Sequence, residues 1–322
     1  MLKRRNRMID AVNNPWAEMH ADAVRRIDSG TIHDFYWVKD PKSKYGLLIK
    51  FAALDDEQGL ITRIQGLTII RRAEDSRLEL YMLVNSNDDR EMFLTLCNDL
   101  IKVSADCYDP DMLLKTINAR LKRWQKFLSQ GKDLSMTEPR QMGLITELNF
   151  LINVLTAKTS LAEAITSWVG PEFDRQDFSA GSIFIEIKSF ISSKGPFIRV
   201  SSLHQLNFRI KPLYLMAYPI SRNDSGNSII DLIIQIRELF TATDQAASEE
   251  FENKLAQYGY LEGITEAPFY KWIIGSGTFY TVDEKFPKIL AGEVADQITA
   301  VEYTIDLSRC RNFETDLNSI DF

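Results

Sequence analysis

The chain has few of the residues that build thiolate metal sites, disulfide frameworks and histidine-based hydrolases. Its only cysteines are Cys97, Cys107 and Cys310, and its only histidines are His20, His33 and His204. Neither set has the paired spacing of a zinc site, and an odd number of cysteines argues against a disulfide framework. No G-x-S-x-G turn is present, so a Ser-His-Asp hydrolase is not indicated either.

The sequence also lacks any apolar run of the length that spans a membrane. Its basic start, Met1–Arg7, is not followed by an uninterrupted apolar stretch, so we expect a cytoplasmic, bacterial-type protein without membrane association. A hydrophobic content of 45% with 26% charged residues is that of an ordinary globular protein. The length of 322 residues favours two domains or one elaborated domain.

The net charge of −7 argues against a passive nucleic-acid coat, whose affinity would come from many phosphate contacts. The charges are nevertheless segregated, because no acidic residue occurs from Ile187 to Asn223. That stretch holds Lys188, Lys194, Arg199, Arg209, Lys211 and Arg222. It fits a local phosphate-binding face on an acidic protein, although a solvated surface would look the same.

A short acidic and basic pattern lies inside a predicted hairpin. Three isoleucines, at 183, 185 and 187, alternate with Phe184, Glu186 and Lys188, which predicts a strand with Glu186 and Lys188 on one face. Asp177 precedes this strand in a second short one, with a turn over residues 179–182. A hairpin of that length brings Asp177 across from Glu186.

Two carboxylates and a lysine in this arrangement indicate a site for a hard cation. A charge removed from water has to be paired, hydrogen-bonded or bound to a metal. Carboxylate oxygens suit Mg²⁺ or Mn²⁺, which are the cofactors we expect. Lys188 could then orient a water molecule or stabilise charge that develops on a phosphorane.

The pattern Asp177…Glu186-Ile187-Lys188 resembles the PD-(D/E)XK nuclease superfamily, which includes restriction endonucleases, resolvases and repair nucleases. More narrowly, TELNFL, WVGPEFDRQDF, IEIKS and SSLHQL together look like a bacterial family of PD-(D/E)XK motif proteins linked with restriction and defence gene clusters. The resemblance covers Arg140 to Pro219 well and the flanks loosely. Gln176 stands where the family name has proline, as in many members.

The resemblance implies an αβββαβ core and further site residues. Glu147, on the first core helix, would join the metal site, and the backbone carbonyl of Ile187 would be a metal ligand. Glu147 is also the only acid between Glu138 and Glu163, and it needs a partner if buried; a partly exposed glutamate is the alternative. Gln205 would position a phosphate or the attacking water. Ser201, Ser202 and the helix start after them could hold a phosphate, or Ser202 could simply cap that helix.

The predicted fold class is α/β (α+β), in two parts that meet at the turn-forming segment 129–133. Residues 1–130 are expected to form an N-terminal α+β domain, with recognition or docking as its default role. The resemblance implies that residues 131–322 form the nuclease-like domain with a C-terminal extension. Helices are predicted over 1–30, 88–103, 109–128, 138–157, 228–241 and 248–258, and residues 202–206 are predicted to open another. Strands are predicted over 34–38, 45–51, 67–71, 78–84, 197–201, 213–218, 269–282 and 299–307.

These observations predict a metal-dependent DNA endonuclease that hydrolyses phosphodiester bonds in a bacterial restriction or antiphage system. The predicted catalytic residues are Asp177, Glu186, Lys188, Glu147 and Gln205, and the predicted metal ligands are Asp177, Glu186, Ile187 and Glu147. The predicted nucleic-acid contacts are Lys194, Arg199, Ser201, Ser202, His204, Arg209 and Lys211. Expected partners are DNA, other subunits of a defence system and a second copy of the chain. The alternatives are a module that has lost cleavage and only binds DNA or assembles a complex, and a nuclease that acts on RNA.

Overall fold

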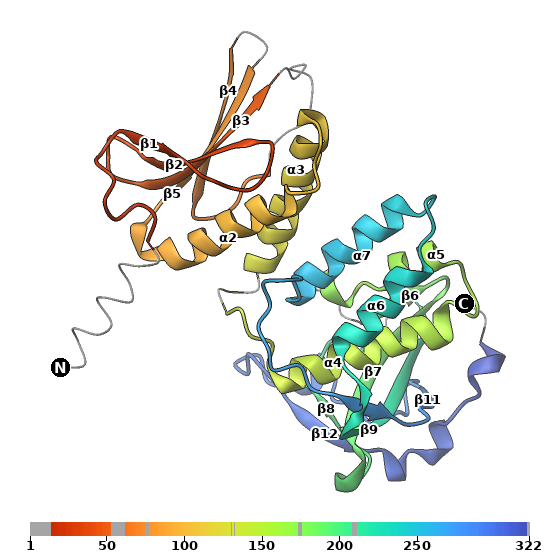
Figure 1. The fold of residues 1–322 in the computed structure, drawn as a ribbon. Helices are drawn as coiled ribbons and strands as arrows, with labels where there is room; N and C mark the ends of the chain where they lie inside the picture. Colours follow the sequence, from red (N-terminus) through yellow and green to blue (C-terminus); the bar gives the residue numbers. More distant parts are fainter. Residues whose placement is uncertain are drawn as a thin grey trace. The chain divides into compact units, whose positions relative to one another are not determined.

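The computed structural model describes residues 14–52, 62–74, 77–129, 131, 133–172, 176–207 and 211–320, and it divides into two compact units (Figure 1). Unit 1 comprises Met1–Lys132 with the short return Leu261–Ile264, and unit 2 comprises Asp133–Tyr260 with Thr265–Phe322. Both contain helices and sheets, so the predicted mixed α/β (α+β) class is confirmed. No helix in the described part of the chain is long and apolar enough to cross a membrane.

Unit 1 is a five-stranded antiparallel sheet with two helices. In spatial order its strands are β1 (Ala23–Arg26), β2 (Asp34–Lys39), β3 (Tyr45–Ala52), β5 (Arg77–Val84) and β4 (Leu67–Glu74). The helices are α2 (Arg90–Val103) and α3 (Pro110–Leu128). The side chain of Asp109 caps α3 by accepting a hydrogen bond from the Met112 amide at 2.7 Å. A buried Asp99–Arg120 ion pair of 2.6 Å joins the two helices.

The helix predicted over residues 1–30 is wrong where the structure describes it, and residues 1–13 lie outside the described part. Ala23–Arg26 is a strand paired with β2, and Val24 is 54% exposed. Trp16 is buried because its indole donates to the Gly46 carbonyl at 2.9 Å and its ring stacks on Tyr45. The apolar spacing therefore reflects one anchored tryptophan and an edge strand.

Unit 2 is built around a mixed sheet. Its strands lie in the order β10 (Trp272–Ile274), β9 (Leu213–Asn227), β7 (Ile183–Ile191) and β6 (Phe178–Ala180), and β11 (Thr278–Thr281) also pairs with β9. β7 and β9 run parallel, and the other pairs are antiparallel. The strands β8 (Phe197–Val200) and β12 (Tyr303–Asp306) form a separate antiparallel pair.

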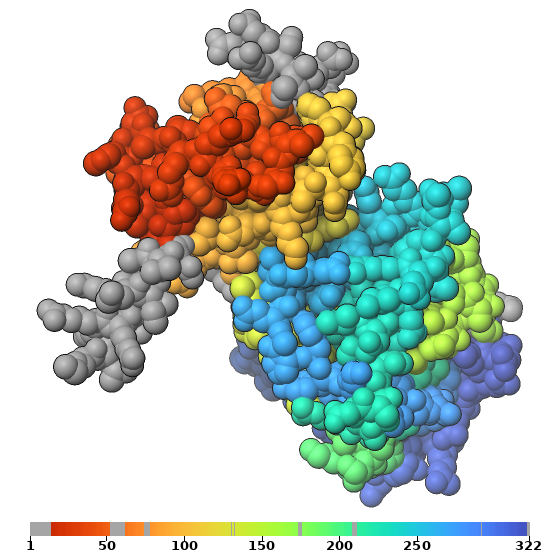
Figure 2. Space-filling view, in the orientation of Figure 1, coloured from red at the N-terminus to blue at the C-terminus, as the bar shows by residue number. Residues whose placement is uncertain are grey.

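Helices cover one face of this sheet. They are α4 (Glu138–Phe150), which continues as a π-helical turn over Leu151–Leu155, α5 (Leu161–Ser167), α6 (Ile229–Leu239) and α7 (Gln245–Tyr258). Figure 2 shows α6 and α7, in teal to light blue, at the visible surface of unit 2. The isoleucines of β7 pack into the core with Leu148 of α4 and Ile233 of α6, whereas Leu215 of β9 packs in a second cluster with Ile198 of β8 and Ile305 of β12.

The prediction that residues 202–206 open a helix is also wrong. This segment forms successive turns, in which the Gln205 amide donates to the Ser202 carbonyl and the Asn207 amide to the His204 carbonyl. Pro212 follows closely and disfavours helical conformation in the residue before it. Residues 208–210 lie outside the described part. The second helix of the expected αβββαβ order is thus not formed over 202–206, and the third strand, β8, pairs with β12.

Candidate active site

The β6–β7 hairpin positions the predicted carboxylates. Phe178 pairs with Ile185, so Asp177, one residue before β6, stands opposite Glu186 when the register is extended. The side chain of Asp177 accepts a hydrogen bond from the Ile187 amide, with 2.7 Å between Oδ2 and N. The predicted opposition of Asp177 and Glu186 therefore matches the register of the hairpin.

Asp177 is fixed from behind by the segment that precedes it. Its carbonyl accepts hydrogen bonds from the amides of Val169 and Gly170, both at 2.9 Å. A Cβ on Gly170 would lie 3.0 Å from Oδ1 and 3.1 Å from Cα of Asp177. Glycine at position 170 allows this close approach, because any side chain would push Asp177 out of place.

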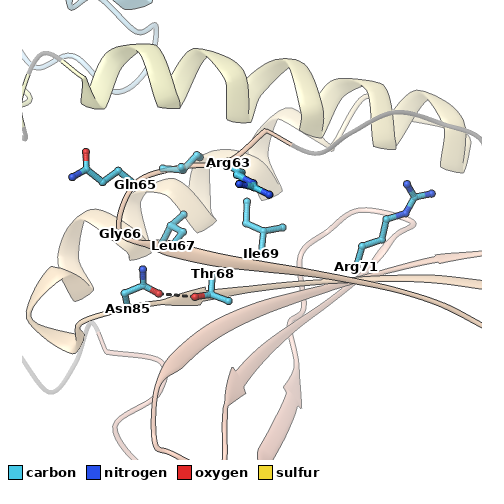
Figure 3. Close-up of a pocket in the computed structure, with 9 residues that line it drawn as sticks. Arg63, Gln65, Gly66, Leu67, Thr68, Ile69, Arg71 and Asn85 are labelled. Carbon is cyan, nitrogen blue, oxygen red and sulfur yellow. Dashed lines mark hydrogen bonds between the residues drawn. The ribbon is translucent and has the colours of Figure 1, made fainter.

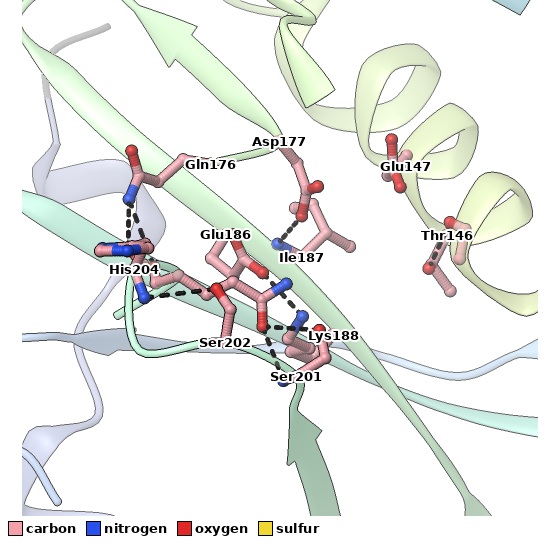
Figure 4. Close-up of polar contacts among 12 residues, drawn as sticks. Thr146, Glu147, Gln176, Asp177, Glu186, Ile187, Lys188, Ser201, Ser202 and His204 are labelled. Atoms are coloured by element: carbon pink, nitrogen blue, oxygen red, sulfur yellow. Dashed lines mark hydrogen bonds and ion pairs between the residues drawn. The ribbon is translucent and has the colours of Figure 1, made fainter. Parts of the chain in front are cut away.

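Glu186 and Lys188 form an ion pair in the site (Figure 4). Glu186 is 1% exposed, and Nζ of Lys188 lies 2.7 Å from its Oε1 as an ion pair. Within the described residues, neither carboxylate oxygen accepts a well-aligned hydrogen bond. Burial and the charge of Asp177 raise the pKa of Glu186 to about 8, even though Lys188 lowers it. Burial alone lowers the pKa of Lys188, but Glu186 and Asp177 raise it by more, so the net shift is upward.

Glu147 joins this group from α4. It is 6% exposed, its Oε2 accepts the Trp168 indole N–H at 2.7 Å, and its Oε1 accepts the Tyr258 hydroxyl at 2.9 Å. Burial, followed by the charge of Asp177, raises its pKa well above the ordinary value for glutamate. Glu147 is therefore a buried carboxyl group held by two uncharged hydrogen-bond donors, and it lies close enough to Asp177 for that charge to raise its pKa.

The partners of Glu147 are themselves held in place. A Cβ on Gly143 would lie 2.6 Å from the Tyr258 hydroxyl, so glycine leaves the space that this hydroxyl occupies. Trp168 directly follows α5, whose last turn is bound by the buried Lys254, with Nζ 2.8 Å from the Ile165 carbonyl. Helices α5 and α7 thus fix both hydrogen-bond donors of Glu147.

The residues present fit a divalent cation. Asp177, Glu186 and Glu147 bring three carboxyl groups near one lysine, and the Glu186 oxygens lack aligned hydrogen bonds within the described part. A hard cation bound by oxygen would relieve this repulsion. Both oxygens of Glu147 already accept hydrogen bonds, from Trp168 and Tyr258, so the protein ligands would be Asp177, Glu186 and a backbone carbonyl. Ile187 can offer that carbonyl, because its N–H and C=O point to one side of the strand, beyond the end of β6.

The turn after β8 is hydrogen-bonded to Gln176, the residue before Asp177. Gln205 Oε1 accepts a hydrogen bond from the Ser201 amide at 3.0 Å. The buried Gln176 donates to the carbonyls of His204 and Gln205, at 3.2 Å and 3.3 Å. Gln176, at the position of the family's proline, therefore ties Asp177 to this turn, a role that the sequence analysis missed.

The predicted nucleic-acid contacts are spread over several environments. Lys194, His204 and Arg199 are exposed, and Arg199 is paired with Glu302, the residue before β12. Lys211 donates to the Gly181 carbonyl at 2.8 Å and so supports the β6–β7 turn. Arg209 lies outside the described residues.

The two serines of this set belong to the turn after β8. Ser201 bonds Gln205, and the Ser202 hydroxyl accepts a hydrogen bond from the His204 amide at 3.3 Å. The helix start at which a phosphate was expected to bind is not formed, since residues 202–206 form turns.

A comparison with models of protein families assigns the chain to a family. Residues 12–308 match the family described as "Putative PD-(D/E)XK family member (DUF4420)". Because the match covers most of the sequence, the chain belongs to this family, which confirms the resemblance drawn from the motif. No curated protein and no solved structure matches the chain.

Proposed function

We propose that the protein is a metal-dependent deoxyribonuclease that hydrolyses phosphodiester bonds in a bacterial restriction or antiphage system. The observation that carries the proposal is the Glu186 carboxylate, which is buried without aligned hydrogen bonds in the described part of the chain, opposite Asp177 and 2.7 Å from Lys188. Membership of a PD-(D/E)XK family supports nuclease chemistry. The acid-free stretch from Ile187 to Asn223 supports a polyanionic substrate.

Each residue then has a distinct task. Asp177, Glu186 and the Ile187 carbonyl hold Mg²⁺ or Mn²⁺, which when bound neutralises phosphate charge and lowers the pKa of water. Lys188, kept protonated by its neighbours, donates a hydrogen bond that aligns the attacking water and stabilises the charged phosphorane oxygens. Glu147, held by hydrogen bonds from Trp168 and Tyr258, would support Asp177 in the position from which it binds the metal.

A second candidate is a nuclease-fold subunit that binds DNA or assembles a complex without cleaving. Two contacts favour it. Lys188 forms an ion pair with Glu186, and the Ile187 amide donates a hydrogen bond to Asp177, so each carboxylate has a partner without a cation. An inactive site of this kind would bind DNA equally well with and without magnesium.

Cleavage of plasmid and phage DNA by the purified full chain, with Mg²⁺ or Mn²⁺, tests the proposal. We expect metal-dependent nicking or cutting, and we expect Asp177→Ala, Glu186→Ala and Lys188→Ala each to slow it by about a thousandfold or more, equivalent to ~4 kcal/mol of barrier. Lys285→Ala, at an exposed lysine of unit 2 outside the predicted site and nucleic-acid contacts, is the matched control for folding and charge, and circular dichroism checks each variant. Wild-type cutting by any of the three site variants contradicts the assignment. An RNA substrate cut in preference to DNA would assign the site to RNA.

A further inference from the structure

A groove in unit 1 and a buried lysine in unit 2 have no part in the proposed reaction. The groove has a volume of about 650 Å³ and is lined by residues 63–69 with Arg71 and Asn85 (Figure 3). The Thr68 hydroxyl donates to the Asn85 side chain there at 2.7 Å, so polar groups of the lining bind each other. The lysine is Lys254 of α7, which is 1% exposed. A buried charge has to be paired or hydrogen-bonded, so the partners of Lys254 define what it does.

The ammonium group of Lys254 has four partners. It donates hydrogen bonds to the carbonyls of Ile165 and Thr166, at 2.8 Å and 3.1 Å. It also forms ion pairs with Glu250, one turn earlier on α7, at 3.1 Å, and with Glu172 at 3.8 Å. Two of these partners are backbone carbonyls, and three of the four belong to one short stretch of chain, residues 165–172.

This stretch, residues 165–172, is named the Trp168 segment, and Lys254 binds it at both ends. Its first residues are the last turn of α5, a helix of seven residues with no basic side chain in that turn. A helix so short is not stable by itself, and its last carbonyls have no partners within the helix. Lys254 satisfies two of these carbonyls from α7 and places a positive charge at the negative end of α5.

The Trp168 segment holds two carboxyl groups of the candidate active site. The Trp168 indole donates to Oε2 of Glu147 at 2.7 Å. The amides of Val169 and Gly170 both donate to the Asp177 carbonyl at 2.9 Å. These hydrogen bonds begin on residues that lie between the two ends bound by Lys254.

Helix α7 also contacts the middle of the segment. The Trp168 ring packs against the rings of Phe251 and Tyr258, with centroids 6.1 Å and 6.2 Å apart. Phe251, Lys254 and Tyr258 follow one another at spacings of three and four residues, so they lie on one face of α7. That face therefore holds the Trp168 segment with two rings in the middle and one ammonium group at the ends.

We propose that Lys254 is a positioning residue of the candidate active site. Its ammonium group fixes the Trp168 segment, and this segment in turn holds Glu147 and Asp177 in place. Groups that hold a metal ligand in this indirect way typically change metal affinity by about 10- to 100-fold. The effect of Lys254 on metal binding rests on the proposed function, whereas its effect on the segment does not.

The test uses two variants of the full chain, Lys254→Met, which keeps the length of the side chain without its donors, and the shorter, uncharged Lys254→Gln. Exchange of the Trp168 indole N–H is followed by NMR without metal, and the backbone amides of the β7–β9 ladder report global unfolding. Mn²⁺ affinity is measured by electron paramagnetic resonance with duplex DNA present. Lys285→Met, at an exposed lysine of unit 2, is the matched control.

We expect the indole exchange of both Lys254 variants to accelerate at least tenfold more than that of the β7–β9 amides. Their Mn²⁺ affinity should fall about tenfold, and Lys285→Met should match the wild type in both measurements. The proposal is overturned if the indole and the β7–β9 amides accelerate by the same factor, because Lys254 would then contribute to overall stability alone. Wild-type Mn²⁺ affinity in both Lys254 variants also overturns it. If the wild type binds no Mn²⁺, the proposed function is contradicted, and indole exchange alone decides whether Lys254 holds the segment.

Discussion

At the scale of single residues, Glu186 is a carboxyl group buried without an aligned hydrogen bond in the described part of the chain. It is almost completely buried, faces Asp177, and has Lys188 as its ion-pair partner. Its pKa is raised from 4.5 to about 8. Between these pH values the folded protein therefore keeps a proton on Glu186 that the unfolded chain has lost. A bound divalent cation would favour the ionised carboxylate and so lower this pKa again.

This linkage predicts how stability depends on pH. For a raised carboxyl pKa, the stabilising contribution is fully present below pH 4.5 and is lost as pH rises toward 8. The pKa values of Glu147 and Asp177 shift in the same direction, whereas Lys188 stays charged across this window. We therefore expect urea unfolding in EDTA to show stability falling between pH 5 and pH 8, at ordinary buffer conditions.

Glu186→Gln is the control for this pH dependence, because it removes the titrating group and keeps the side-chain shape. Its decline in stability between the same pH values should be shallower than that of the wild type. Magnesium should restore wild-type stability at pH 8 and have little effect on the variant. Parallel pH profiles for the two proteins would show that Glu186 does not carry the linkage.

Residue periodicity predicted how Asp177, Glu186 and Lys188 are brought together, but not the contacts that hold them. Asp177, Glu186 and Lys188 follow from the period-two pattern and one turn, both of which are local in sequence. The donors to Glu147 are Trp168 and Tyr258, which lie 21 and 111 residues away, and only the packing of α5 and α7 brings them together. Gln176 was adjacent to Asp177 and could have been suspected, but the carbonyls that it binds belong to a turn predicted as a helix.

At the level of elements, α4 and α7 approach each other closely where Tyr258 reaches Glu147. Gly143→Ala would place a Cβ 2.6 Å from the Tyr258 hydroxyl. We expect this variant to lose about 1–3 kcal/mol of unfolding free energy, because the ring has to move and a buried carboxylate loses a donor. Urea denaturation of Gly143→Ala, Tyr258→Phe and the double variant measures the effect. If both changes act on the same contact, the double variant loses less than the sum; additive losses would contradict the shared contact.

Elements with strong periodicity were predicted well, and anchored irregular segments were not. Strands β2 to β5 and helices α2 and α3 follow alternating or helical patterns, and the structure confirms them. Residues 14–30 and 202–206 were assigned as helices from apolar spacing and a serine start. In the structure, pairing with β2 makes part of the first segment a strand. In the second, the Gln205 side chain accepts a hydrogen bond from the Ser201 amide and so stabilises a turn. Apolar spacing in a short stretch of sequence predicts neither contact.

For the molecule as a whole, the two units are not simple halves of the sequence. The segment Leu261–Ile264 returns to unit 1, where the Glu262 carbonyl accepts a hydrogen bond from Arg120 at 2.7 Å. Arg120 is buried with Asp99, so loss of that carbonyl would leave a buried guanidinium with one acceptor fewer. No local pattern predicts a four-residue return of this kind.

A fragment of residues 1–132 should therefore be less stable than the same region in the full chain, by about 1–3 kcal/mol for the lost acceptor. Hydrogen exchange of the α2 and α3 amides in both proteins measures the difference. A synthetic peptide of residues 257–268 added to the fragment should slow that exchange, and a peptide with Pro in place of Leu261 should act more weakly. Equal exchange in the fragment and the full chain would contradict this account of unit 1.

The central claim is that Asp177 and Glu186 hold a divalent cation at a nuclease site. The most direct measurement is a titration of Mn²⁺ into the full chain, followed by electron paramagnetic resonance, with duplex DNA present to complete the site. The wild type should bind Mn²⁺ saturably, and Glu186→Gln and Asp177→Asn should bind it at least tenfold more weakly, while the control Lys285→Ala should behave as the wild type. Equal Mn²⁺ binding by the wild type and Glu186→Gln, or none by either protein, would contradict the account.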